Sequence, residues 1–286
     1  MNRSRGRLAT TLLALLLGWL VAYPLLLVAL ESVRGPDGFT LQWFARFVRE
    51  PREWQALWAT LWTSVVSVLL AGALGIPLAF LFERFDFPGR RLLGALVALP
   101  VVLPPLVGVI AFLFLYGETG FVGRLVQALL RLTDPPWRLE GAWAILLVHA
   151  YSLYVYFYLF TRAGLARLDP AAIEAAQSLG AGRWRTLARV TLPLLMPSLR
   201  GAALLSFMTA LASFSAPYIF GGGFRVMTTQ IVFTRLNGEY GMAMAQTVVL
   251  SLLALTGLWL ASDRGVETAG SGKGIAPAAV PIRHRG

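Results

Sequence analysis

Six long runs without a charged residue constrain this chain more than any other feature. They cover residues 8–30, 56–82, 92–116, 141–161, 201–224 and 240–262. Each exceeds the roughly 20 residues that a helix needs to cross about 30 Å of hydrocarbon. Soluble domains usually carry about 25% charged residues, whereas this chain carries 14%. We therefore predict an all-α polytopic membrane protein with six transmembrane helices.

The first run follows Arg3, Arg5 and Arg7, as the apolar region of a signal peptide would. Its apolar stretch is longer than the usual 7–15 residues of such a region, and no small-residue cleavage site follows Tyr23 and Pro24. We predict that residues 1–30 form a retained signal-anchor helix.

The basic residues orient the predicted spans. With the N-terminus in the cytoplasm, 16 of the 25 lysines and arginines fall in inner segments and 9 in outer segments. The positive-inside rule predicts such an excess of lysine and arginine on the cytoplasmic side. We therefore predict a membrane protein with both termini in the cytoplasm. We interpret the net charge of +11 as a topology signal rather than as a sign of nucleic-acid binding. Membrane lipid is the expected surrounding.

The remaining organisation follows from the runs. Residues 31–55 are expected to form an outer loop with an amphipathic segment, and residues 56–262 a five-helix core. Apolar positions at helical spacing in 121–130 predict a second amphipathic outer helix. A long inner loop, 165–197, separates the fourth and fifth runs, and residues 263–286 are expected to be a flexible cytoplasmic tail or linker.

The spans themselves contain no acidic or basic side chain. Proton relays and ion-coupled carriers usually keep a charged residue there, so a secondary carrier or channel is the less favoured alternative. The chain has no cysteine, two histidines and no nucleophile or paired-acid motif. We therefore predict that it is not an enzyme and holds no metal.

Prolines suggest where a translocation path lies. Pro100, Pro104 and Pro105 interrupt the third run, and Pro217 interrupts the fifth. Membrane helices tolerate such breaks beside protein or a water-filled cavity. The candidate path residues are in the fifth run, at Ser206, Thr209, Ser213 and Tyr218. His149 and the nearby tyrosines of the fourth run are interpreted mainly as packing residues.

The inner loop 165–197 is the most informative segment. Asp169 is a suitable helix N-cap, Pro170 a suitable first helical residue, and Gly180 a suitable left-handed C-terminal cap. A second helix is expected from Arg183, with Trp184, Leu187 and Val190 as its apolar positions. By itself, this pattern is also compatible with a helical hairpin that only caps the bundle.

The spacing of this loop resembles the EAA loop of ABC importer permeases. Glu174-Ala175-Ala176 is followed after three residues by Gly180, and after nine more by Val190-x-Leu192-Pro193. The family pattern has isoleucine where this chain has valine. The resemblance extends over about residues 39–262, and its finer features are most similar to ferric-iron permeases, with thiamine, phosphonate and polyamine permeases as close relatives.

The resemblance implies a type I importer fold in which two such domains enclose one path. It implies two cytoplasmic ABC ATPase subunits, which bind ATP and magnesium while this chain holds no cofactor. It also implies a periplasmic or lipid-anchored binding protein and a place in the bacterial inner membrane. The ATPase-coupling residues it implies are Glu174, Ala175, Ala176, Gly180, Ile173 and Leu179.

Only one EAA loop occurs here, although ferric-iron and thiamine permeases often fuse two domains in one chain. The chain is therefore expected to be a single-domain subunit that pairs in a homodimer or heterodimer, or the first half of a longer protein. Ferric iron is the expected substrate.

Overall fold

The computed structural model describes residues 3–35 and 38–262, and within them six helical segments are long and apolar enough to cross a membrane. These segments are Thr10–Ser32, Pro51–Arg84, Pro105–Leu130, Gly141–Leu165, Arg183–Leu211 and Tyr240–Leu260. The predicted all-α fold with six candidate spans is confirmed. The proposed tail, 263–286, lies outside the described residues.

The N-terminal segment is one helical rod, in which α1 (Arg3–Leu17), a π-helical turn (Gly18–Ala22) and α2 (Tyr23–Ser32) follow without a break. A two-residue hairpin of β1 (Arg34–Gly35) and β2 (Gly38–Phe39) leads to α3 (Gln42–Arg49). The apolar side of α3 buries Phe47 against Ala56, Met227 and Met242. The amphipathic segment predicted in the outer loop is therefore a helix that packs on the bundle.

Two long helices form the centre of the fold. They are α4 (Pro51–Arg84) and α8 (Gly141–Leu165), and α11 (Leu192–Leu211) packs against both. Ala71, Leu153, Phe157 and Ala202 meet in their shared core. The small residues let the helices approach closely, which is how membrane helices gain packing contacts without a hydrophobic driving force.

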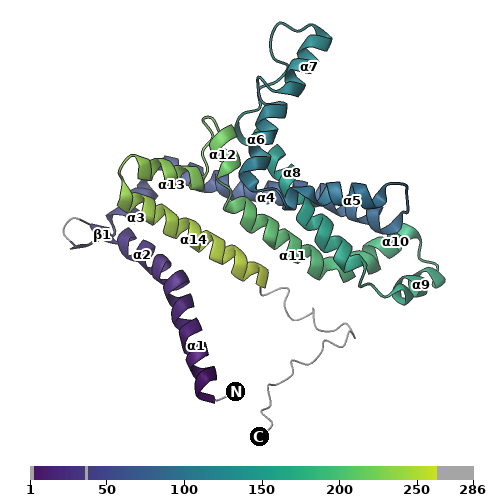
Figure 1. Ribbon diagram of the computed structural model, residues 1–286, viewed down its shortest axis with the longest axis horizontal. Helices are drawn as coiled ribbons and strands as arrows, with labels where there is room; N and C mark the ends of the chain where they lie inside the picture. Colours follow the sequence, from purple (N-terminus) through teal and green to yellow (C-terminus); the bar gives the residue numbers. More distant parts are fainter. Residues whose placement is uncertain (1–2, 36–37, 263–286) are drawn as a thin grey trace.

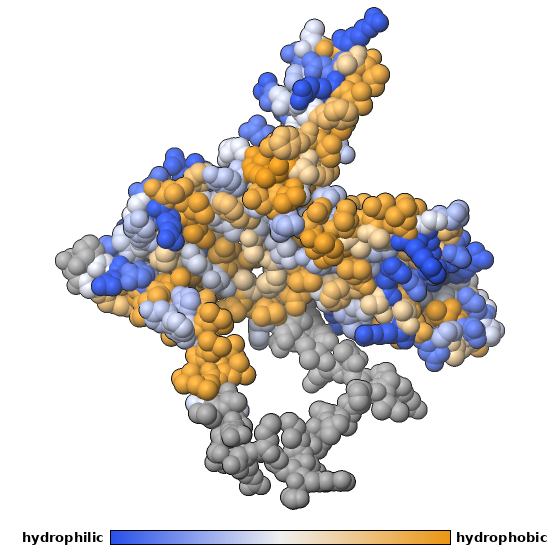
Figure 2. Space-filling model, in the orientation of Figure 1, coloured by the Kyte–Doolittle hydropathy of each residue, from blue (hydrophilic) through white to orange (hydrophobic). Residues whose placement is uncertain are grey.

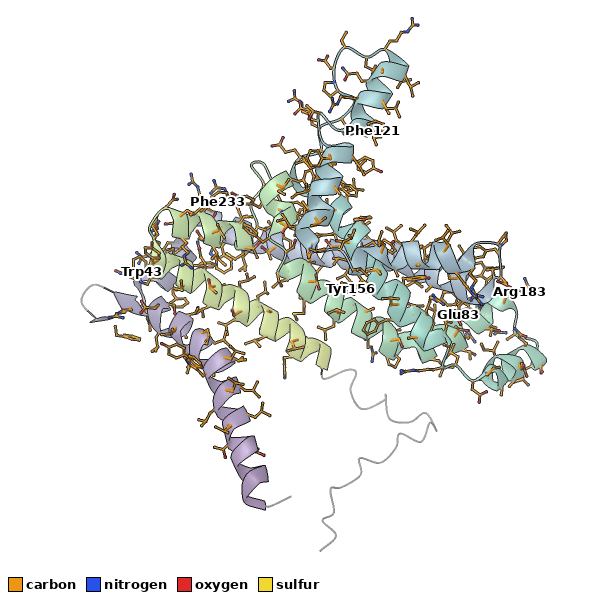
Figure 3. The ribbon with its side chains drawn as sticks, in the orientation of Figure 1. Trp43, Glu83, Phe121, Tyr156, Arg183 and Phe233 are labelled. Carbon is orange, nitrogen blue, oxygen red and sulfur yellow. The ribbon has the colours of Figure 1, made fainter. Side chains whose placement is uncertain are left out.

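The last helix, α14 (Tyr240–Ser262), packs against α2 and against α13 (Met227–Leu236). In Figure 1, α3 and α13 lie at one end of the bundle, and α9 (Pro170–Ser178) and α10 (Arg183–Thr186) lie at the other. We call these the α13 end and the loop end. Figure 3 shows Trp43 and Phe233 at the α13 end and Glu83 and Arg183 at the loop end.

The prediction that residues 92–116 form one continuous helix is wrong. This stretch is divided into α5 (Arg90–Ala98), a 3-10 turn (Leu99–Val101) and α6 (Pro105–Tyr116). Pro100, Pro104 and Pro105 cause the division, because proline removes a backbone donor and clashes with the preceding turn. Figure 1 shows α6 and α7 (Phe121–Leu130) projecting away from the bundle. The helix predicted at 121–130 is present, and with α6 it forms the third candidate span.

The fifth predicted span, 201–224, is also wrong in its bounds. The helical segment begins at Arg183, continues through a π-helical turn (Leu187–Thr191) into α11, and ends at Leu211. Pro217 lies in a separate short helix, α12 (Ser215–Phe220), and does not interrupt the span. The arginines that ended the uncharged run do not end the helix, because charged residues are good helix formers and are expelled only from the hydrocarbon.

Apolar surface is extensive. Figure 2 shows hydrophobic residues over the middle of the molecule and over α6, with hydrophilic residues at the loop end, at the α13 end and over α7. Trp19 on the N-terminal rod, Phe114 on α6 and Trp259 on α14 are all more than half exposed. A soluble protein rarely leaves so large an apolar surface in water, so this distribution is that of a chain surrounded by lipid.

Candidate functional site

The loop end carries the helix that the sequence predicted. The side chain of Asp169 accepts a hydrogen bond from the backbone N–H of Ala171 at 2.9 Å and caps α9. Gly180 has a φ of +81°, and its N–H donates to the carbonyl of Gln177 at 2.9 Å. The N–H of Ala181 donates to the carbonyl of Ala176 at 3.0 Å. These two bonds form a Schellman cap, so the predicted helix start and end are confirmed.

The predicted coupling residues divide between two sides of α9. Glu174, Ala175, Leu179 and Gly180 are exposed, whereas Ile173 and Ala176 are half-buried. Glu174 makes no ion pair within the described chain. α9 contacts α10 and the π-helical turn that follows it, so the half-buried side chains hold the helix in place while the others remain available to a partner.

An exposed apolar pair lies beside this cap. Leu179 is 88% exposed and Trp184 is 82% exposed. The sequence identifies Trp184 as one of the apolar positions of the second helix, and the structure places it outward. Its helix, α10, is only four residues long, and the buried residue in it is Thr186. The loop end therefore presents a leucine and a tryptophan to the outside on either side of the turn.

A cavity of about 750 Å³ lies inside the bundle. It is bordered by the proline-broken segment between α5 and α6, by the middle of α8, and by the break between α11 and α12. Its polar lining residues are His149, Tyr151, Ser152, Tyr156, Thr209, Ser213 and Ser215. No acidic or basic residue lines it apart from the histidine. Such a cavity accepts a solute through hydroxyl and imidazole groups rather than through fixed charge.

His149 joins three elements at this cavity. Its Nδ1 lies 2.8 Å from Ser67 Oγ on α4, and its Nε2 lies 2.9 Å from Ser213 Oγ. Ser67 already donates its hydroxyl proton to the carbonyl of Thr63 at 2.6 Å. A hydroxyl has only one proton to donate, so Nδ1–H donates to Ser67, and Nε2 accepts from Ser213. These two bonds tie the break after α11 to α8 and α4.

The four candidate path residues do not form one group. Thr209 and Ser213 line the cavity. Ser206 is fully buried with an unpaired hydroxyl and is not among the lining residues. Tyr218 is 53% exposed and stacks on Phe214 and Phe233 with ring centroids 4.9 and 6.2 Å apart. His149 was interpreted mainly as a packing residue, yet it lines the cavity. Its position as a histidine within an otherwise uncharged span was the sequence signal that could have identified it.

A second polar cluster lies at the α13 end, just outside the predicted run 56–82. The carboxylate of Glu53 is 2% exposed and accepts hydrogen bonds from Gln230 Nε2 at 3.0 Å and Gln246 Nε2 at 2.8 Å. Gln246 Nε2 also donates to Thr234 Oγ1 at 3.1 Å. Glu53 therefore connects α4 to α13 and α14. Sequence reasoning missed it because uncharged runs exclude acidic residues by definition.

Cationic side chains surround this end. Arg46 pairs with Glu50 and Glu239, and the hydrogen bonds to these two carboxylates raise its pKa. Arg52 and Arg225 line a separate pocket of about 370 Å³ between α4 and the segment that precedes α13. The α13 end thus offers two exposed guanidinium groups close to the bundle.

Replacing Glu53 with leucine is expected to loosen the α13 end. The change leaves the amides of Gln230 and Gln246 without their charged acceptor, and hydrogen bonds to charged groups contribute about 1.5–3 kcal/mol each. We expect a loss of about 3 kcal/mol, seen as a melting temperature lower by roughly 6–12 °C in detergent. Glu50→Leu, at a partly exposed neighbouring acid, should change it by only about 1–2 °C; equal shifts would contradict the buried role of Glu53.

Comparisons with known proteins agree with this architecture. The sequence pattern of the family described as "Binding-protein-dependent transport system inner membrane component" matches residues 71–262. A probable ABC transporter permease protein, y4fN of Sinorhizobium fredii, is 32% identical over 79% of this chain, and the match spans only 40% of that relative.

Two further relatives match over most of their own length. The molybdenum transport system permease protein ModB of Escherichia coli K12 is 33% identical, with 73% of this chain and 93% of ModB covered. The sulfate transport system permease protein CysT of the same organism is 29% identical, covering 77% of this chain and 79% of CysT. Among solved structures, a chain of a bacterial ABC transporter involved in alginate import superimposes with a TM-score of 0.74 at 20% identity, covering 91% of this chain and 95% of that one.

Proposed function

The chain belongs to the family of binding-protein-dependent transport system inner membrane components, the ABC importer permeases, and on this premise we propose that it forms half of the path for a small oxyanion. The predicted family is confirmed. The observation that carries the substrate class is the cavity in which Ser213, His149 and Ser67 form one hydrogen-bonded chain.

The lining of this cavity suits an anion that is bound by hydrogen bonds and not by lysine or arginine side chains. Hydroxyl groups of Ser152, Thr209 and Ser213 border it. Each donates its proton within the chain here, to the carbonyls of Val148 and Leu205 and to His149, and would donate to an oxyanion after rotating toward the cavity. Relatives named for molybdenum and sulfate transport support the same class, because sulfate is a tetrahedral oxyanion and molybdenum in neutral aerated water occurs as one. Ferric iron, expected from the sequence, has no specific support in these relatives.

Coupling to ATP hydrolysis is proposed to occur at the loop end. Glu174, Ala175, Leu179 and Gly180 would contact a cytoplasmic ATPase, while Ile173 and Ala176 hold α9 against the bundle. The exposure of Leu179 and Trp184 supports this assignment, because exposed apolar side chains beside a rigid cap are typical of a protein contact. The loop end would then face the cytoplasm, with both termini on that side.

The complete transporter is proposed to contain two permease domains, two ATPase subunits and a substrate-binding protein. This chain would provide one permease domain, and ATP and magnesium would bind in the ATPase subunits. One similar structure contains a periplasmic protein bound to an alginate pentasaccharide, which supports delivery of substrate at the α13 end, where Arg52 and Arg225 line their pocket.

The substrate class is tested by reconstituting the transporter with candidate binding proteins and measuring ATP hydrolysis. We expect stimulation by a binding protein loaded with molybdate or sulfate. Stimulation only by ferric-iron, thiamine, phosphonate or polyamine binding proteins would reject the oxyanion proposal and keep the permease role. Transport that continues without ATP or without an ATPase subunit would instead indicate a secondary carrier or channel.

Replacing His149 with alanine is expected to slow transport more than it alters the fold. The change removes the acceptor of the Ser213 hydroxyl and the donor to Ser67 at the wall of the cavity. Leaving buried hydrogen-bonding groups without a partner costs about 1–3 kcal/mol, so we expect substrate-stimulated ATP hydrolysis to fall by about tenfold.

Ser152→Ala is the matched control. Ser152 lines the same cavity, but its hydroxyl donates to the carbonyl of Val148, one turn away in its own helix, at 2.9 Å. We expect a change below about twofold for Ser152→Ala. Equal effects of the two substitutions on hydrolysis would show that the hydrogen-bonded chain through His149 has no special role.

A further inference from the structure

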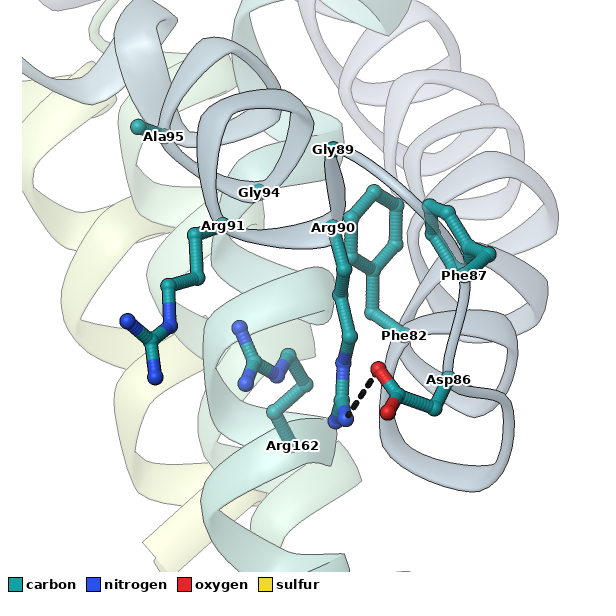
Figure 4. A pocket seen from close by; sticks show the side chains of 9 residues that line it. All are labelled: Phe82, Asp86, Phe87, Gly89, Arg90, Arg91, Gly94, Ala95 and Arg162. Atoms are coloured by element: carbon teal, nitrogen blue, oxygen red, sulfur yellow. Dashed lines mark ion pairs between the residues drawn. The ribbon is translucent and has the colours of Figure 1, made fainter.

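A second cavity, at the loop end, gathers arginines that the transport role does not use. Its volume is about 740 Å³, and it lies between the end of α4, the first turns of α5 and the last turns of α8. Arg90, Arg91 and Arg162 line it together with Asp86. In the close view of Figure 4, the guanidinium group of Arg162 lies between those of Arg90 and Arg91.

The positive charge in this cavity exceeds the negative charge that faces it. Arg162 lies 3.4 Å from Glu83 and donates to the hydroxyl of Tyr158 at 3.0 Å, so its position is held by the bundle. Arg90 lies 3.9 Å from Asp86, whose side chain is 93% exposed. The side chain of Arg91 forms no ion pair or hydrogen bond among the described residues. Three guanidinium groups therefore face two carboxylates, one of which is almost fully in solvent.

The backbone adds to this preference for an anion. α5 begins after Gly89, and no side chain caps its first turn. The N–H of Arg90 donates to the carbonyl of Phe87 at 3.1 Å, which leaves the N–H groups of Arg91 and Leu92 for an anion. The first N–H groups of a helix and its positive dipole end attract anions. Arg90 and Arg91 are the first two residues of this helix, so the uncapped turn and the arginines act on the same side of the cavity.

Apolar side chains continue from the arginines along α5. Leu92 is 67% exposed, Leu93 44% and Leu96 52%. Figure 2 shows hydrophilic residues at the loop end next to hydrophobic residues over this part of the molecule. The cavity also lies where two candidate spans end, at Arg84 and Leu165, which is the depth of lipid headgroups. A ligand with a phosphate and acyl chains fits both the arginine-lined cavity and the exposed leucines of α5. A free phosphate fits only the cavity.

We infer that this cavity binds the phosphate group of an anionic phospholipid, with its acyl chains along the leucines of α5. Guanidinium groups bind phosphate through charge-assisted, often bidentate hydrogen bonds. Bound lipid would connect the α4–α5 turn to α8 at the end of the bundle that carries α9.

The test uses the complete transporter in nanodiscs of phosphatidylcholine, with and without phosphatidylglycerol, and native mass spectrometry to count retained lipid. We expect the wild-type protein to retain phosphatidylglycerol in preference to phosphatidylcholine. Arg90→Gln/Arg91→Gln is expected to weaken this retention about thirtyfold, since two cations near an anionic surface are removed.

Arg49→Gln/Arg235→Gln removes the same charge from exposed positions at the opposite end and is expected to leave retention unchanged. Equal losses in both double variants, or none in either, would overturn the site. Inorganic phosphate is added in a separate arm at millimolar concentration. Displacement of the lipid by this phosphate would assign the cavity to a free oxyanion and overturn the lipid assignment.

Discussion

Replacing Leu179 with aspartate is expected to weaken both ATPase binding and transport while leaving the permease folded. Leu179 is 88% exposed and contributes almost nothing to the packing of the isolated chain. Truncating a central apolar contact of an interface typically weakens binding by 2 kcal/mol or more, and a buried unpaired carboxylate adds to this loss. We expect the ATPase to bind about thirtyfold more weakly and substrate uptake to fall at least as much, measured by pull-down and by uptake into proteoliposomes.

Leu236→Asp provides the control, because Leu236 is a 72% exposed leucine at the α13 end. This variant should keep ATPase binding within about twofold of the wild type. Both variants should elute as the wild type does in gel filtration, which excludes unfolding as the cause. Normal ATPase binding by Leu179→Asp would show that the proposed coupling surface is in the wrong place.

Local chemistry made the loop end predictable. The helix start at Asp169 and Pro170 depends on a side-chain cap and a fixed backbone angle, and the end at Gly180 depends on a left-handed residue. The start and the end of this helix each depend on interactions within about four residues. The spacing of the motif is therefore enough to specify the helix. Tertiary packing determines only which side of each helix faces the bundle. In α10, this packing leaves Trp184 facing outward, although it is an apolar residue.

Span boundaries were predicted less well because charge and helicity are different properties. An uncharged run marks the stretch that lipid tolerates, whereas a helix ends where its backbone is interrupted. Arg200 ended a run but not α11, and Pro100 ended α5 inside a run. A proline therefore interrupts a helix even inside an uncharged stretch, whereas an arginine does not interrupt one.

The polar contacts inside the bundle could not be predicted from one sequence. Ser67, His149 and Ser213 come from separate parts of the chain, and Glu53 meets Gln230 and Gln246 about 180 residues later. Residue type gives only a weak signal for such pairs, since a serine in a membrane helix more often bonds to its own backbone. Ser64 and Ser152 do so here.

Introducing a methyl group at Gly75 is expected to give the largest loss of stability in the bundle. A Cβ at this position would lie 2.7 Å from Phe157 Cβ and 2.9 Å from the backbone nitrogen of Tyr158, and closer still to the carbonyl oxygen of Tyr154. These atoms belong to the backbone and first carbon of α8, so no side-chain rotation can relieve the clash. Overpacking typically costs 1–3 kcal/mol even where side chains can move, and we expect Gly75→Ala to lose at least about 3 kcal/mol, measured as a lower melting temperature and lower yield.

Gly72 lies one turn earlier on the same face of α4 and separates helix propensity from packing. A Cβ there would lie 3.5 Å from two ring atoms of Phe157, which is ordinary contact. Alanine exceeds glycine in helix propensity by about 1 kcal/mol, so Gly72→Ala is expected to be neutral or slightly stabilising. If both alanines were tolerated alike, α4 and α8 could not approach as closely as they do at Gly75. α11 packs against both helices, so a wider spacing of α4 and α8 would also disturb its packing.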